Sequence, residues 1–272
     1  MKRVLLSLLI ISSYILTANA QADSTQVADA KPTEQEVSVV AEEQQAVEAF
    51  DNGKFSEAAE IYEKLISEHN AKSEVSADLY YNLGNAYFRD GEIAKAILNY
   101  ERALLLNPGD KDIRHNIKFA NTRIEDKIEN SGSFFLTKWI NSFQETMSSN
   151  AWAWFAVVSF VLLIVCTFVF FFSKTVLAKQ ITFYAGIVLV VLVILGNVFA
   201  FRQRSDILNR DSAIIMTPSA IVRSSPNTNG KEVFTLHAGT KIKITKEDRD
   251  WSEIETAAGN VGWIENKRIE KI

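Results

Sequence analysis

Residues 152–201 read WAWFAVVSFVLLIVCTFVFFF, SKTVLAKQ and ITFYAGIVLVVLVILGNVFAF. The first and third segments, residues 152–172 and 181–201, are apolar runs without a charged residue. At about 1.5 Å of rise per residue, each run spans roughly 30 Å as a helix, which matches the hydrocarbon core of a bilayer. The alternative, a pair of buried core helices, is disfavoured because uncharged runs of this length are rare in soluble proteins. Residues 173–180 allow only a tight turn, so the stretch predicts a transmembrane hairpin whose two flanks lie on the same side of the membrane.

Composition limits the classes of function that remain open. The chain has 272 residues and a formal net charge of −4, so it lacks the basic footprint of a nucleic-acid-binding protein. Its one cysteine, Cys166, lies in the first apolar run, and His69, His115 and His237 lie far apart in the sequence. We find no nucleophile near a histidine, no metal-ligand spacing, no phosphate-binding loop and no carboxylate pair in an apolar setting. The sequence therefore predicts a protein that is not an enzyme and that uses no cofactor or metal.

The first 20 residues have the features of a secretory signal peptide. Lys2 and Arg3 form a charged start, an apolar core follows, and Ala18-Asn19-Ala20 supplies small residues at the cleavage-site positions. An uncleaved membrane anchor is the alternative. Both interpretations export the segment between the signal and the first apolar run, so we expect an inner-membrane protein of bacteria whose soluble domains both lie in the periplasm.

Charges beside the apolar runs bear on this orientation. Lys174 and Lys179 lie in the turn that we place in the cytoplasm, in agreement with the positive-inside rule. Arg202, Arg204 and Arg210 lie on the other side and disagree with it. We give the N-terminal signal more weight because the earliest element usually sets the orientation of a membrane protein.

A polar segment separates the signal from the first folded region. Residues 21–40 are rich in Ala, Thr, Gln and Glu and show no spaced apolar pattern, so we interpret them as a disordered tether. From Gln21 to Val75 acidic residues outnumber basic ones, which favours a solvated surface over an anion-binding patch.

Residues 41–130 contain a helical repeat. The segment FDNGKFSEAAEIYEKLI at 50–66 aligns with FRDGEIAKAILNYERAL at 88–104, which places Gly53 on Gly91. The second unit closely resembles the tetratricopeptide consensus, in which small residues sit where two helices cross closely. The first unit is weaker, because Glu42, Gln45 and Ala46 occupy positions where large apolar residues are usual. The consensus positions of the second unit are Tyr80, Leu83, Gly84, Tyr87, Ala96, Tyr100, Ala103 and Pro108.

A third amphipathic helix is predicted over residues 112–129 as a cap for the short repeat stack. Its apolar face holds Ile113, Ile117, Ala120, Ile124 and Ile128.

The concave face of such a stack is the expected peptide-binding surface. Asn82 lies where some tetratricopeptide domains hold a partner's C-terminal carboxylate. Those domains also use basic residues on the next helix, and here the matching positions are Asp112 and Asn116, so this clamp is incomplete. The alternative is that the asparagines are consensus residues without a ligand. The candidate peptide-binding residues are Asp78, Tyr81, Asn82, Asn85, Phe88 and Arg89.

Residues 131–150 connect the repeats to the apolar runs. Their apolar residues recur at helical spacing, which predicts a juxtamembrane amphipathic helix lying on the outer leaflet; packing on the repeat domain is the alternative. The apolar residues at helical spacing in this segment are Phe134, Phe135, Leu136, Trp139, Ile140, Phe143 and Met147.

Within the apolar runs of residues 152–201, Asn197 is expected to bond to a neighbouring helix or to be hydrated.

Residues 212–272 predict five or six short β-strands separated by turn residues, that is, a small all-β barrel. The segments AIVRSSP at 220–226, LHAGT at 236–240 and GWI at 262–264 resemble the bacterial SH3 domain. We expect Gly239 and Gly262 in tight turns, and Trp251 and Trp263 in the barrel centre. In the alternative, Trp251 lines a ligand groove.

Arg223, on a predicted strand of this barrel, has two alternative environments. It is expected to pair with Asp248 or Asp250, or to remain solvated.

The complete order of elements resembles a known family. A signal, a short tetratricopeptide stack ending in NIKFANTRIEDKI, paired membrane helices and a bacterial SH3 domain together resemble the aerotolerance operon protein E family of Bacteroides, over nearly the whole chain. The resemblance implies a role in an envelope complex linked to oxygen tolerance or envelope stress. It also implies partner membrane proteins with von Willebrand A domains.

Two functions remain open at this stage. The first is a membrane-anchored scaffold, in which the repeats and the barrel hold other proteins of an envelope complex. The alternative is a cell-wall sensor, in which the SH3-like domain binds peptidoglycan. Both modules are generic binding folds, so the fold alone does not identify the partner.

Overall fold

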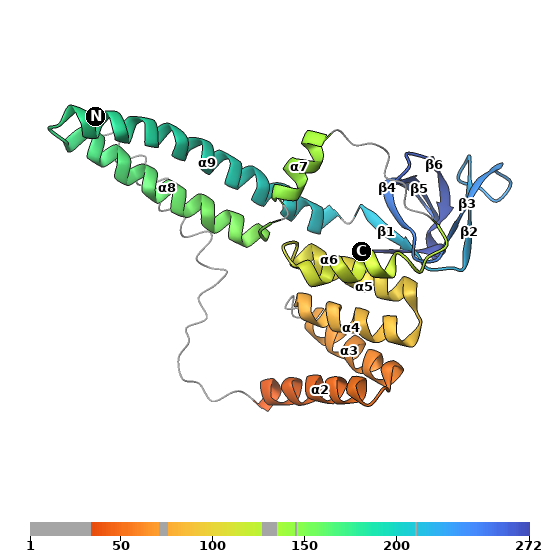
Figure 1. Ribbon diagram of the computed structural model, residues 1–272. Helices are drawn as coiled ribbons and strands as arrows, with labels where there is room; N and C mark the ends of the chain where they lie inside the picture. The colour runs from red at the N-terminus through yellow and green to blue at the C-terminus, as the bar shows by residue number, and fades with distance from the viewer. Residues whose placement is uncertain (1–33, 71–75, 127–134, 145, 210) are drawn as a thin grey trace. The chain divides into compact units, whose positions relative to one another are not determined.

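The computed structural model describes residues 34–70, 76–126, 135–144, 146–209 and 211–272. The predicted signal peptide and the predicted tether as far as residue 33 lie outside the described residues. Residues 42–272 form one compact unit, which contains the helical repeats, two long apolar helices and an antiparallel sheet. Most of these elements are labelled in Figure 1.

The repeat region consists of consecutive helices that lie alongside one another (Figure 1). Helix α2 begins at Glu34, inside the segment predicted as a tether, because its Glu-, Gln- and Ala-rich sequence favours helix. From Val40 to Asp51, the part of α2 whose side chains are described, the buried residues are Ala46 and Ala49, so this helix buries small side chains. The helices are α2 (Glu34–Asp51), α3 (Phe55–Asn70), α4 (Ala77–Asp90), α5 (Ile93–Leu106) and α6 (Lys111–Ala120).

The close crossing predicted within the second unit is confirmed. A Cβ atom on Gly84 would lie 2.6 Å from the ring of Tyr100. Tyr100 is 2% exposed and Ala96 is completely buried, so α4 and α5 meet without space for a larger side chain.

The predicted capping helix is shorter than expected. Asp110 begins α6 by accepting hydrogen bonds from the backbone N–H groups of Asp112 and Ile113. The helix ends at Ala120, since Thr122 bonds back to the Phe119 carbonyl with both its hydroxyl and its N–H. Ile113, Ile117 and Ala120 are buried as predicted, but Ile124 lies in the turns that follow the helix, and Ile128 lies outside the described residues.

Two helices are long and apolar enough to cross a membrane: α8 (Ser149–Phe172) and α9 (Val176–Asn209). They pack against each other as an antiparallel pair (Figure 1). The predicted turn of residues 173–180 is wrong in length, because α9 already begins at Val176. Helix α9 has 34 residues and is about 51 Å long. It ends at Asn209, well beyond the predicted end at Phe201.

Small residues bring the two apolar helices close together. A Cβ on Gly196 would lie 3.0 Å from the Cβ of Ala156 and 3.3 Å from the Trp152 carbonyl oxygen. Asn197 donates instead to the Val193 carbonyl of its own helix, at 2.8 Å. Most of the remaining surface of the pair is exposed and apolar; examples are Val158, Leu162, Phe168, Tyr184, Ile187 and Val191.

The short helix α7 (Phe135–Gln144) packs against the start of this pair. The Phe143 ring lies 5.6 Å from the Trp152 ring and 6.1 Å from the Phe199 ring, centroid to centroid. The Trp152 indole donates to the Gln144 carbonyl at 2.8 Å. Among the described contacts, α7 therefore packs on the apolar helices rather than on the repeats.

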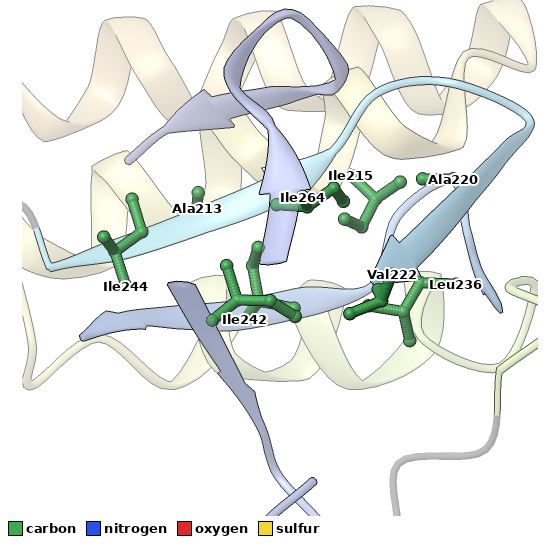
Figure 2. Close-up of a cluster of buried hydrophobic side chains, with 9 residues drawn as sticks. Ala213, Ile215, Ala220, Val222, Leu236, Ile242, Ile244 and Ile264 are labelled. Atoms are coloured by element: carbon green, nitrogen blue, oxygen red, sulfur yellow. The ribbon is translucent and has the colours of Figure 1, made fainter. Parts of the chain in front are cut away.

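The C-terminal region is a seven-stranded antiparallel sheet in the order β3-β2-β6-β5-β4-β1-β7. Its core is aliphatic and lies between the facing strands (Figure 2). The strands are β1 (Ser212–Ile215), β2 (Ser219–Arg223), β3 (Glu232–His237), β4 (Lys241–Asp248), β5 (Trp251–Thr256), β6 (Val261–Glu265) and β7 (Ile269–Lys271). The core residues are Ala213, Ile215, Ala220, Val222, Leu236, Ile242, Ile244, Ile254 and Ile264.

Two expectations about the barrel are wrong. Trp251 and Trp263 do not fill its centre, because side chains alternate along a strand and Ser252, Ile254, Gly262 and Ile264 take the inward positions of β5 and β6. Gly262 is not in a turn but within β6, where a Cβ would lie 2.5 Å from the Val222 side chain. It allows β6 to pass close to β2. Gly239 does occupy a turn, with a φ of 91°.

Candidate interaction surfaces

The face of α4 that was predicted to bind peptides is partly occupied by the protein's own side chains. The Asn85 Oδ1 atom accepts hydrogen bonds from the Tyr100 hydroxyl at 2.8 Å and from Asn116 Nδ2 at 2.9 Å. Asn116 Nδ2 also donates to the Tyr81 hydroxyl at 3.2 Å. Burial raises the pKa of Tyr100, so its phenol remains a neutral donor. Tyr81 and Asn85 thus join α4 to α5 and α6.

The other predicted residues of this face point to different neighbours. Phe88 lies against Phe119 of α6, with ring centroids 5.4 Å apart. Arg89 lies over the Phe55 ring, 4.6 Å from its centroid, and so packs on the first unit.

Asp78 and Asn82 remain available to a partner. Asp78 is exposed and Asn82 is half-buried, and neither side chain forms a hydrogen bond or ion pair with the described residues. Asp112, also exposed, uses its backbone N–H in capping α6. The structure thus leaves Asp78 and Asp112 uncovered in the first turns of α4 and α6, and Asn82 one turn further along α4.

The outer face of the barrel carries both tryptophans. Trp251 pairs with Asp248 and Glu265 across the sheet, and Trp263 pairs with Glu253, which places the two rings diagonally on one face. Both side chains are half-exposed. The Lys246 ammonium lies 5.9 Å from the Trp263 ring centroid.

Arg223 was expected to pair with Asp248 or Asp250, and this is wrong. It donates to the Gly230 carbonyl at 2.8 Å and lies 3.7 Å from Glu232. The register shift between Val222 and Arg223 explains the difference, because it turns Arg223 towards the β2–β3 loop.

A third surface joins the repeats to the barrel. Every residue of α5 from Ala96 to Glu101 is buried, although only one face of the helix packs on α4. Lys241 of β4 reaches Glu101 at 2.7 Å. Arg102 reaches Glu270 at 2.9 Å and donates to the Lys271 carbonyl at 2.8 Å. The barrel and α6 therefore together cover the sides of α5 that do not pack on α4.

The same junction holds a carboxylate in a set of converging donors, which we call the Asp126 contact. Asp126 Oδ2 accepts from the His237 backbone N–H at 2.7 Å and from the Thr240 hydroxyl at 2.6 Å. Asp126 Oδ1 lies 2.7 Å from His237 Nδ1, and Glu125 lies 3.6 Å from the other ring nitrogen of His237. Four groups from the repeats and the barrel thus meet in one cluster.

Electrostatics in the Asp126 contact favour the charged forms of both partners. Burial alone would raise the pKa of Asp126, but hydrogen bonds from His237, from Thr240 and from the His237 backbone outweigh it and lower the pKa. The hydrogen bond to Asp126 raises the pKa of His237 against a smaller opposing effect of burial, and the charges of Asp126 and Glu125 add to the rise.

The Asp126 contact should make docking of the barrel depend on pH. His237, whose pKa is raised, stabilises docking fully below about 6.5, its ordinary pKa, and this contribution is lost as the pH rises through the higher pKa. Asp126, whose pKa is lowered, contributes above about 3.9, and its contribution is lost as the pH falls through the lower pKa. We expect the slowest amide exchange at this junction between about pH 4 and 6.5, measured by hydrogen exchange corrected for the intrinsic pH dependence.

His237→Gln supplies the control, because it retains the backbone donor but no group that titrates near neutral pH. Its loss of protection above pH 6.5 should be absent, while the acid-side loss should remain. Equal alkaline-side loss in both proteins would contradict the assignment to His237.

Sequence reasoning missed this junction. The sequence indicates only that His237 lies far from the other two histidines, and it gives no signal that connects His237 with Glu125 or Asp126. The 111 positions that separate Asp126 from His237 explain the omission, since no local period connects them. Within the described ranges, no group of three or more His, Cys, Asp or Glu side chains is arranged to hold a metal.

Comparison with known proteins supports both soluble regions. Residues 77–110 match the tetratricopeptide repeat family, and these residues comprise α4, α5 and the connection to α6. Residues 218–270 match the bacterial SH3 domain family and cover most of the barrel. No curated protein matches the chain. The fold is thus a helical tetratricopeptide region, two apolar helices that could span a membrane, and an SH3-like antiparallel barrel.

Proposed function

We propose that this protein is a non-enzymatic, membrane-anchored scaffold of a bacterial envelope complex. The observation that carries the proposal is that one interaction module precedes, and a second follows, two long helices with exposed apolar surfaces in the sequence. Both modules are typical of protein or cell-wall binding. Holding them on one anchor raises the effective concentration of whatever they bind.

The contact between the modules supports the proposed topology. Asp126 precedes α8 and His237 follows α9, and their side chains lie 2.7 Å apart. Two crossings between them leave both residues on one side of a bilayer, whereas a single crossing would separate them. The proposal therefore places α8 and α9 as a membrane hairpin, with the repeats and the barrel both in the periplasm.

Labelling of introduced cysteines tests this topology. In a Cys166→Ala background, Thr228→Cys lies in the exposed β2–β3 loop and Thr175→Cys in the exposed turn between α8 and α9. We expect a membrane-impermeant maleimide to label Thr228→Cys on intact spheroplasts and Thr175→Cys only after permeabilisation. Labelling of Thr175→Cys on intact spheroplasts would exclude the proposed orientation.

The partner class is inferred from the family resemblance. We propose that the free surface of α4 at Asp78 and Asn82 contacts membrane proteins with von Willebrand A domains, in a complex linked to oxygen tolerance or envelope stress. A photo-crosslinking residue at Asn82 tests this, with Glu60, exposed on α3, as the control position. The proposal predicts an adduct at Asn82 that contains a von Willebrand A protein, and none at Glu60; equal adducts at both positions would argue against it.

Peptidoglycan binding by the barrel is the second candidate. The observation in its favour is the outer sheet face, where Trp251 and Trp263 are half-exposed beside Lys246. The detergent-solubilised chain should then sediment with purified sacculi, and Trp251→Ala should reduce the bound fraction. A chain that stays entirely in the supernatant rejects this candidate.

A further inference from the structure

The turn between β3 and β4, residues Leu236–Lys241, is built to hold a carboxylate. Gly239 adopts a φ of 91° and donates its N–H to the Ile215 carbonyl at 2.8 Å, while the Thr240 N–H bonds to the His237 carbonyl at 3.2 Å. These bonds fix the turn on the barrel. They direct three donors towards one place: the His237 N–H, the His237 ring and the Thr240 hydroxyl. Charge-assisted bonds from preset donors are the usual means of recognising a carboxylate.

An apolar contact lies beside these donors. A Cβ on Gly239 would lie 2.5 Å from Ile124 Cγ2 and 3.2 Å from Ile97 Cδ1. Only glycine therefore leaves room for the isoleucine. The turn thus presents an apolar contact and a carboxylate contact, and these are filled by residues two positions apart, Ile124 and Asp126.

The occupying segment is bound by the barrel without being part of it. Residues 121–126 follow the end of α6 and contain no regular helix or strand. They are separated from the turn by 111 positions of chain, counted from Asp126 to His237. The segment Ile124-Glu125-Asp126 therefore resembles a short peptide ligand bound to a pre-organised site on another domain.

We propose that the Leu236–Lys241 turn is a binding site for short segments that carry an aliphatic side chain two residues before a carboxylate, and that Ile124–Asp126 occupies it as an internal, displaceable ligand. Attachment to the same chain gives the internal segment a high effective concentration, so a free segment competes only weakly while Asp126 is in place. The inference goes beyond the scaffold function and does not depend on it, since neither Asn82 nor the orientation of the hairpin enters it.

Binding of a synthetic peptide to the full chain tests the proposal. The probe is fluorescein-labelled, C-terminally amidated ANTRIED, the sequence of residues 120–126, added to detergent-solubilised protein. Asp126→Asn removes the negative charge and one of the two acceptor oxygens from the carboxylate contact and so weakens the internal ligand, and we expect this variant to bind the peptide about 10-fold or more tightly than the wild type. Ile124→Ser empties the apolar half and should strengthen binding by a smaller factor. Lys118→Gln is the matched control, because Lys118 is exposed on α6 and makes no described contact with the turn, and it should bind as the wild type does.

A second substitution in the turn links binding to the site. Thr240→Val in the Asp126→Asn background should return peptide affinity to the wild-type level or below. Amide exchange in β4 and β5 confirms that the barrel of each variant is folded. If folded Asp126→Asn and Ile124→Ser bind the peptide no better than the wild type, the proposal is overturned. The crosslinking result at Asn82 would be unaffected, so failure of this proposal is distinguishable from failure of the scaffold.

Discussion

Replacing Ile254 by alanine should destabilise the barrel by about 2–5 kcal/mol, as is usual for truncation of a completely buried isoleucine. Ile254 is 0% exposed and belongs to the aliphatic core of the barrel. Ile215, Ile242 and Ile264 of the same core are labelled in Figure 2. A domain of this size gains only about 3–5 kcal/mol from one core. The loss should therefore leave much of the barrel unfolded, and its contacts with α5 should be lost with it.

Proteolysis in increasing urea, followed by detection of the C-terminal fragment, measures this loss. Val233→Ala is the control, because Val233 lies on edge strand β3 and is 52% exposed. Its effect should stay within about 0.5 kcal/mol. Equal urea midpoints for the two variants would contradict the assignment of Ile254 to the core.

Gly84→Val is expected to destabilise the repeat region by about 3 kcal/mol, at the upper end of the usual cost of overpacking. The new Cβ would meet the Tyr100 ring at 2.6 Å. The ring cannot turn away easily, since its hydroxyl is bonded to Asn85 at 2.8 Å and it is almost completely buried. Because the ring cannot move, the clash can be relieved only by separating α4 from α5 where the two helices cross.

Amide exchange in α4 and α5 reports the result, since a loss of this size raises exchange in both helices together. Gly53→Ala separates clash from backbone strain. Gly53 has a φ of 78° but no atom within 4 Å of its would-be Cβ. The expected loss there is about 1 kcal/mol, from the left-handed conformation alone. Unchanged exchange in Gly84→Val would show that the crossing is looser than the structure describes.

The elements that the sequence predicts well are those with local signals. Uninterrupted apolar runs indicated α8 and α9, and the spacing of Gly84, Ala96 and Tyr100 indicated the crossing of α4 and α5. Each signal depends on residues within one or two helices. The ends of elements depend on side-chain competition, which periodicity does not record: Thr122 ends α6 early, and α9 continues past Phe201 although its last turns are polar.

Features that depend on distant residues could not be predicted from the sequence. The two tryptophans of the barrel were assigned to its core by size, but the register of β5 and β6 decides which residues face inward. In the candidate peptide-binding face, Asn85 is hydrogen-bonded to Tyr100 and Tyr81 is hydrogen-bonded to Asn116. The second of these bonds could not be predicted without knowing where α6 lies. His237 has no neighbour in sequence that would indicate its bond to Asp126.

The position of the Asp126 contact in the chain sets the order in which the protein can mature. One side of the contact is synthesised before α8, and the other side only after α9. During synthesis, Ile124 and Asp126 of the repeat region therefore remain uncovered until the strands of the barrel have been made. In a membrane-spanning chain, these strands must also have been exported. Joining of the two modules is then the closing event of biogenesis, and a chain cut short within α9 would leave its repeat region permanently unpaired.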